Sequence, residues 1–157
     1  MNRLVLALTI TTTLSGICFP VEGFAQVLPP AKRAAQVRIT RGPSLELAHD
    51  DLAIIRWTST NPGGSDEHFG LVHYGTDPKT LNKTAKSHIR LNRDHPFTTF
   101  RVRLDHLKSK TVYYYTVSSI DSNGRSDEAT SAIAHFVTPG AGDRVVAYPP
   151  MSLSKPN

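Results

Sequence analysis

Cysteine is almost absent from the sequence. Its one cysteine, Cys18, lies close to the N-terminus, so no disulfide can form within the chain. This excludes a small disulfide-stabilised scaffold, a zinc site built on paired cysteines, and thiol chemistry in the folded part. A domain without disulfides must be held by its core alone, and therefore needs the length of a full domain.

Patterns that carry catalysis are missing as well. The chain has no Gly-x-Ser-x-Gly motif and no glycine-rich phosphate loop. Its histidines are not spaced as metal ligands on one helix or strand. They lie at positions 49, 68, 73, 88, 95, 106 and 135. We therefore predict a non-enzyme with no catalytic residue, no metal and no cofactor, and treat the histidines as scattered structural or surface residues.

Residues 1–25 are typical of a signal peptide. One positive charge at Arg3 precedes an uncharged run from Leu4 to Ile17, and small residues stand at the positions that a signal peptidase reads before a cleavage after Ala25. The apolar run is short for a membrane anchor, and Ile17 is a poor residue to precede a lipidated cysteine. We predict a secreted or periplasmic protein with no transmembrane segment after cleavage; lipidation of Cys18 is the weaker alternative.

No part of the remaining chain has the period of an amphipathic helix, and short alternating segments separated by turn residues predict strands. Seven strands are expected, over residues 35–40, 52–59, 68–74, 86–91, 98–104, 111–121 and 130–138. Strong turn signals include Gly42-Pro43, which we expect to end the first strand, and Asn123-Gly124. The pattern predicts an all-β, seven-stranded immunoglobulin-like sandwich over residues 36–138, preceded by a leader (26–35) and followed by a flexible tail (139–157). We expect a monomer.

The stretch from Leu107 to Val117 carries three consecutive tyrosines. In a strand, Tyr113 and Tyr115 share one face and Tyr114 takes the other. A tyrosine at the start of the sixth strand, whose hydroxyl bonds back to the preceding corner, is the tyrosine corner of immunoglobulin-like sandwiches, and Leu107, Thr111 and Tyr113 have its spacing. We expect Trp57, Phe100, Tyr113, Tyr115 and Phe136 to meet in one core.

These residues resemble a fibronectin type III domain, with Trp57 in the second strand and Leu107-Thr111-Tyr113 at the corner. A narrower resemblance is to the N-terminal domain of purple acid phosphatases. It rests on Trp57-Thr58, Tyr74-Gly75-Thr76, the corner, and Phe136-Val137-Thr138-Pro139, which in that family leads into the catalytic domain. A two-metal phosphatase needs ligands on several loops, and the sequence after Pro139 offers only Asp143. The resemblance therefore implies a fold and carries over no site residue.

Charge is the one feature that points toward a ligand. Nine lysines and arginines lie between Lys79 and Lys110, against Asp94 and Asp105. Alternation with Phe100, Val102 and Leu104 should turn Arg101 and Arg103 outward. We predict a basic face on the fourth and fifth strands that binds an acidic glycan, an acidic surface or a protein partner. Its candidate residues are Lys86, Arg90, Arg93, Arg101 and Arg103. The alternative is a solvated surface that keeps the protein soluble.

Integrin binding, glycosylation and nucleic-acid binding each have little support in the sequence. Arg125-Ser126-Asp127 stands where some fibronectin domains carry an integrin-binding Arg-Gly-Asp, but the glycine is absent. Asn82 is a glycosylation acceptor only if the source modifies such sites. Nucleic acid is not expected, because basic and aromatic residues do not interleave on one exposed strand.

We predict an exported, non-catalytic interaction or spacer module; the alternative is an accessory or detached N-terminal module of a purple acid phosphatase.

Overall fold

A computed structural model describes residues 29–146. Within this range the chain forms eight strands and no helix. The strands are β1 (Ile39–His49), β2 (Ala53–Thr60), β3 (Glu67–Gly75), β4 (Lys83–Arg90), β5 (Phe97–Leu104), β6 (Val112–Asp121), β7 (Ala134–Val137) and β8 (Arg144–Val146). The all-β prediction is confirmed.

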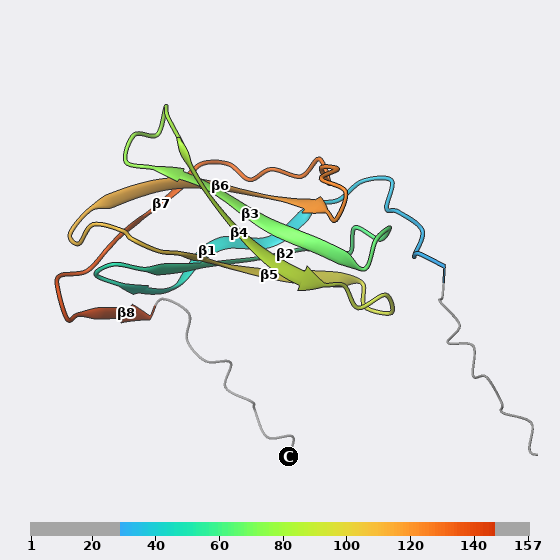
Figure 1. Ribbon diagram of the computed structural model, residues 1–157, viewed down its shortest axis with the longest axis horizontal. Helices are drawn as coiled ribbons and strands as arrows, with labels where there is room; N and C mark the ends of the chain where they lie inside the picture. Colours follow the sequence, from blue (N-terminus) through green and yellow to red (C-terminus); the bar gives the residue numbers. More distant parts are fainter. Residues whose placement is uncertain (1–28, 147–157) are drawn as a thin grey trace, which may run out of the picture.

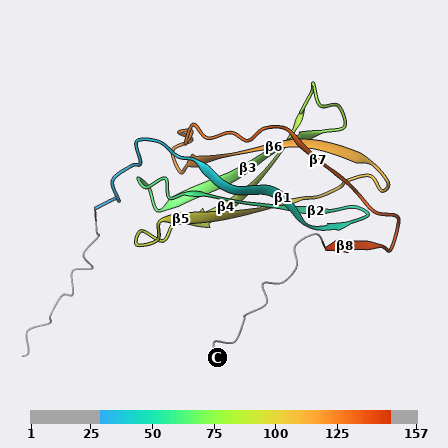
Figure 2. The same cartoon turned by 180° about the vertical axis from the view of Figure 1, so that it is seen from behind.

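The strands form two antiparallel four-stranded sheets that pack face to face as a sandwich (Figure 1). One sheet has the order β5-β2-β1-β8 and the other the order β4-β3-β6-β7. The described part of the leader, residues 29–35, lies at one end of the sandwich, and β8 lies at the opposite end in both views (Figure 2). No helix within residues 29–146 has the length and apolar character needed to cross a membrane.

The core lies between the sheets, on the inward positions of alternating strands. In β5, Phe100, Val102 and Leu104 are buried while Arg101 and Arg103 are exposed, as predicted. Trp57 stacks on Phe100 with 5.1 Å between ring centroids. All five aromatic residues predicted for the core belong to the buried cluster.

The tyrosine corner is present. The backbone N–H of Lys108 donates a hydrogen bond of 2.9 Å to the Tyr113 hydroxyl oxygen, across the turn between β5 and β6. Tyr113 is buried, and its ring stacks on Phe136 of β7. The hydroxyl thus satisfies a backbone donor at the corner while the ring fills the core, which explains why a tyrosine stands here.

The prediction that the first strand ends before Gly42-Pro43 is wrong. β1 continues through this pair to His49. Its pairing with β2 shifts register between Arg41 and Ser44, so the glycine and proline fall in a bulge outside the regular ladder. A proline lacks the N–H that a ladder needs, and a bulge is where a strand can accommodate it. Gly42 has a φ of 78°, in the left-handed region that glycine adopts without strain.

The prediction of seven strands is one too few. β8, in the segment predicted as a tail, pairs with Leu47, Ala48 and His49 of β1. The leader is also tied to the sandwich, because Ala31 forms a bridge with Gly64 of the β2–β3 loop. The predicted signal peptide and its cleavage after Ala25, and residues 147–157 of the predicted tail, lie outside the described residues.

Candidate functional site

Arg101 and Arg103 project from the outer face of the β5-β2-β1-β8 sheet. The register places Arg56 of β2 directly opposite Arg101, and Ile54 opposite Arg103. Arg101 forms an ion pair with Glu46 of β1, and Arg103 donates a 2.6 Å hydrogen bond to Asp105. We call Arg41, Arg56, Arg101 and Arg103 the arginine face. Each of its four guanidinium groups has a partner, and for Arg101 and Arg103 these are Glu46 and Asp105.

The other three predicted residues lie elsewhere. Lys86 and Arg90 belong to β4, in the opposite sheet, where the Lys86 ammonium sits 3.7 Å from the centre of the Phe69 ring. Arg93 follows β4 and binds Asp66 with both its Nε (2.6 Å) and its Nη2 (2.8 Å). This hydrogen bonding is the main reason why the pKa of the Asp66 carboxyl is lowered. The five residues therefore do not share one face.

More of the cations between Lys79 and Lys110 pair with acidic residues than the sequence indicated. Counting acids only between Lys79 and Lys110 left most of the nine cations unpaired. The structure brings in Glu46 and Asp66 from outside that segment, and each pairs with an arginine within it. The excess of positive charge is thereby reduced. The arginine face joins two of the predicted cations, Arg101 and Arg103, to arginines of the neighbouring strands β1 and β2.

A shallow cavity of about 370 Å³ opens on the arginine face. Arg41 and Arg56 line it together with Phe97, whose side chain is 48% exposed. Thr58 of β2 and Thr99 of β5 also line the cavity, and their hydroxyl oxygens form a hydrogen bond of 2.9 Å. Guanidinium groups, hydroxyls and one exposed aromatic ring can bind a ligand that combines negative charge with a polyhydroxylated body.

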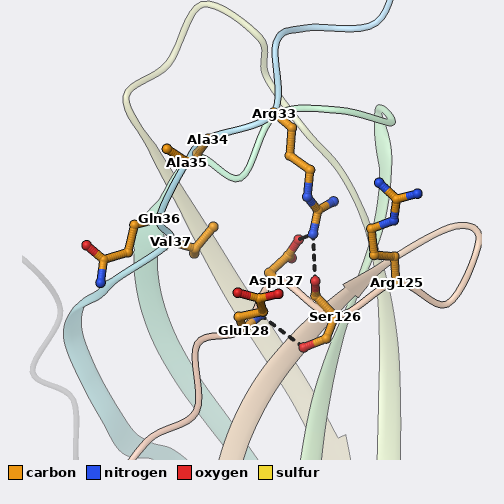
Figure 3. A pocket seen from close by; sticks show the side chains of 9 residues that line it. All are labelled: Arg33, Ala34, Ala35, Gln36, Val37, Arg125, Ser126, Asp127 and Glu128. Atoms are coloured by element: carbon orange, nitrogen blue, oxygen red, sulfur yellow. Dashed lines mark hydrogen bonds and ion pairs between the residues drawn. The ribbon is translucent and has the colours of Figure 1, made fainter.

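A second charged cluster, which sequence reasoning missed, lies at the leader end (Figure 3). The Asp127 side chain is fully buried and accepts hydrogen bonds from Arg33 Nη2 (3.0 Å) and from the Ser119 hydroxyl (2.6 Å). His68 is also fully buried, with its Nε2 3.5 Å from Asp127 Oδ1. Arg33 further donates to the backbone carbonyl of Ser126. The buried Asp127 carboxylate thus adds a side-chain anchor for the leader to the backbone bridge at Ala31.

The contacts of Asp127 determine whether its carboxyl group is ionised. Burial acts to raise the pKa of Asp127, but the contacts with His68, Ser119 and Arg33 outweigh it, and the pKa lies below its ordinary value. Asp127 is therefore ionised at neutral pH. Because it is buried and engaged, Arg125-Ser126-Asp127 cannot present a carboxylate to a metal-dependent receptor as an Arg-Gly-Asp loop does.

The residues of this cluster do not form a hydrolytic triad. In such a triad the histidine stands between the nucleophile and the carboxylate. Here the carboxylate of Asp127 stands between Ser119 and His68, and Ser119 is only 3% exposed. Within residues 29–146, moreover, no three histidine, cysteine or carboxylate side chains gather as a metal site would require. The cluster therefore has the geometry of a structural anchor and not that of a hydrolytic triad.

The sequence of β3 gives an ambiguous signal for the burial of His68. His68 stands in phase with Gly70, Val72 and Tyr74 on β3, the positions that face the core, while Phe69 and Leu71 face outward. Since both faces of β3 carry apolar residues, alternation alone does not tell which face is buried. The arginine that meets this region, Arg33, comes from the leader, where no period exists to read.

Comparison with protein families decides the relationship of the fold. The model of the purple acid phosphatase N-terminal domain matches residues 41–138, and no catalytic-domain family is matched. The chain belongs to this family. The resemblance inferred from the corner and from the Tyr-Gly-Thr segment is thereby confirmed, and the matched family is a non-catalytic domain.

Other comparisons add less. A search of curated proteins gives no match. Among solved structures, the chain is similar to the sensor domain of the anti-sigma factor RsgI4 from Pseudobacteroides cellulosolvens. The two share 19% sequence identity over 67% of this chain and 99% of that one, with a TM-score of 0.41.

Proposed function

We propose that this purple acid phosphatase N-terminal domain is an exported, non-catalytic binding module that holds an acidic glycan on its arginine face. The observation that carries the proposal is the register of β2 and β5, which sets Arg56 directly opposite Arg101. The two guanidinium groups therefore stand side by side on one sheet face, where Arg101 also pairs with Glu46. A bound polyanion adds negative charge that both groups can share.

The surroundings favour a glycan over other polyanions. Threonine hydroxyls and the exposed Phe97 ring line the shallow cavity beside the arginines, so sugar hydroxyls and an apolar ring face have partners next to the charges. Arginine binds carboxylate and sulfate-like groups through two parallel N–H bonds, which gives the interaction direction as well as strength.

The test is retention on an immobilised sulfated glycan of the heparin type, eluted with a salt gradient. Replacing both Arg101 and Arg103 with Gln should lower the elution salt clearly. The matched control replaces Lys79 and Arg144 with Gln, which removes the same charge from positions outside the arginine face. Exposed ion pairs contribute only about 0–1 kcal/mol each, so both variants should unfold close to the wild type.

Equal elution of the two double variants would show that retention follows net charge alone, and the proposal would fail. Binding that is held by paired guanidinium groups should also weaken steeply with salt, because exposed charges are screened beyond about 10 Å at 0.1 M ionic strength.

A second function is favoured by the family match itself: the domain serves as an accessory or detached module of a phosphoesterase of the purple acid phosphatase type. A phosphatase assay with added iron or zinc, beside a metal-stripped control, tests whether the chain has activity of its own. Metal-dependent turnover by the purified chain would contradict a non-catalytic module. Increased activity of a separate metallophosphoesterase on adding the domain would support the accessory role.

A further inference from the structure

The leader end of the sandwich holds a cavity separate from the arginine face. Its volume is about 660 Å³, and its walls come from the leader, the β2–β3 connection, the end of β4 and the turn after β6. Four arginines line it: Arg33, Arg90, Arg93 and Arg125. Three carboxylates, from Asp66, Glu67 and Asp121, stand in the same walls.

Each of these carboxylates already has partners. Asp66 is held by the two-pronged contact with Arg93, and Glu67 pairs with His88 on β4. Asp121 accepts hydrogen bonds from the backbone N–H groups of residues 123 and 125 and lies 3.5 Å from Arg33 Nη1. The acids of the cavity are therefore committed to other groups.

Two of the four arginines are not committed in this way. Among residues 29–146, no carboxylate or carbonyl lies within hydrogen-bond or ion-pair distance of the Arg90 or Arg125 guanidinium group. Arg90 contributes to the positive field at Asp66 without bonding to it. Glu128 is the acidic residue that follows Asp127 in the chain. Its carboxylate lies on the far side of Ser126 from the Arg125 side chain (Figure 3).

From this arrangement we infer that the cavity binds a small hydroxylated anion, a sugar-sized molecule with one phosphate or carboxylate group, between Arg90 and Arg125. Each guanidinium offers a planar pair of donors that fits either anionic group. The volume exceeds what a lone phosphate fills, and Ser65 and Asn123 supply neutral polar groups in the wall for hydroxyls. Arg101 and Arg103 take no part, so this site and the arginine face stand or fall separately.

The experiment is isothermal titration calorimetry at low ionic strength with four probes: inorganic phosphate, glucose 6-phosphate, glucuronate and glucose. We expect saturable binding of glucose 6-phosphate or glucuronate, weaker binding of inorganic phosphate and none of glucose. The two charged sugars present a similar ring with different anionic groups, so the tighter of the two identifies the group that the arginines prefer.

Replacing Arg90 or Arg125 with Gln should each weaken binding about tenfold or more, since a hydrogen bond to a charged group contributes about 1.5–3 kcal/mol. Both residues are exposed, so the variants should fold. Arg144→Gln, at the opposite end of the sandwich, is the matched control and should bind as the wild type does. Lack of saturable binding by all three anions would overturn the proposal. So would anion binding that both variants retain, or glucose binding as tight as that of the charged sugars.

Discussion

Replacing Asp127 with Asn tests how the leader is held to the sandwich. The substitution keeps the shape of the side chain and removes its charge. In the wild type, the carboxylate accepts hydrogen bonds from Arg33 and Ser119 and lies near His68 in a site closed to solvent. A neutral amide in its place would leave the Arg33 guanidinium without its main charged partner.

The structure sets the expected magnitude. Breaking a fully buried ion pair costs about 3–5 kcal/mol, because the remaining charge is stranded in a medium of low polarity. The Arg33 side chain is 28% exposed and keeps its hydrogen bond to the Ser126 carbonyl, so water can rehydrate part of the guanidinium. The loss in unfolding free energy should therefore fall below that range, at about 2–3 kcal/mol at neutral pH.

The pH dependence follows from the lowered pKa of Asp127. A carboxyl whose pKa is lower in the folded state than in the unfolded chain binds fewer protons when folded. It stabilises the fold above its unfolded pKa of about 3.9, and that contribution is lost as the pH falls through the lower, folded pKa. The Asp127→Asn variant lacks this contribution at every pH. Its deficit relative to the wild type should therefore be full at pH 7 and shrink below about pH 4.

Urea unfolding of the two proteins at a series of pH values measures this difference. Glu128→Gln is the matched control, because Glu128 is exposed beside the same cluster and its neutralisation should change stability by less than about 0.5 kcal/mol. A deficit for Asp127→Asn that stays constant down to the acid range, or one no larger than that of the control, would refute the view that an ionised Asp127 anchors the leader.

Two core substitutions have equally definite outcomes. Gly70→Ala should lower the free energy of unfolding by about 1–3 kcal/mol through overpacking, because an added Cβ would lie 2.9 Å from Trp57 Cη2. Adding Trp57→Phe should recover part of that loss in urea unfolding. Strictly additive effects of the two substitutions would contradict this explanation. Tyr113→Phe should cost about 1–3 kcal/mol because the Lys108 N–H loses its acceptor, and a thermal midpoint equal to that of the wild type would show that this hydrogen bond contributes nothing.

The parts of the fold that the sequence predicted are those fixed by local rules. Alternation placed Phe100 inward and Arg101 outward, because neighbouring side chains of a strand take opposite faces whatever the sheet does. The corner was equally readable, since Leu107 and Tyr113 are linked by one short turn and one hydrogen bond. Such features depend on residues that lie close together in the chain.

The errors in the fold have the opposite origin. Gly42-Pro43 is a stop signal in isolation, but the neighbouring strand β2 tolerates it through a bulge, and that requires knowing the partner and its register. β8 is three residues long and entirely exposed, so it has no hydrophobic pattern; only its pairing with β1 makes it a strand.

The candidate sites show the same division. Each of the five predicted cations lies on or beside the strand that the sequence indicated, yet they separate because β4 and β5 belong to different sheets. Consecutive strands usually pair, but in a sandwich some connections cross from one sheet to the other. The charge pattern does not indicate which connections cross. Here the crossing falls between Arg90 and Arg101, so one run of positive charge in the sequence becomes two surfaces. Arg101 then shares its surface with Arg56, while Arg90 shares a cavity with Arg125, and both pairings join residues that lie far apart in the sequence.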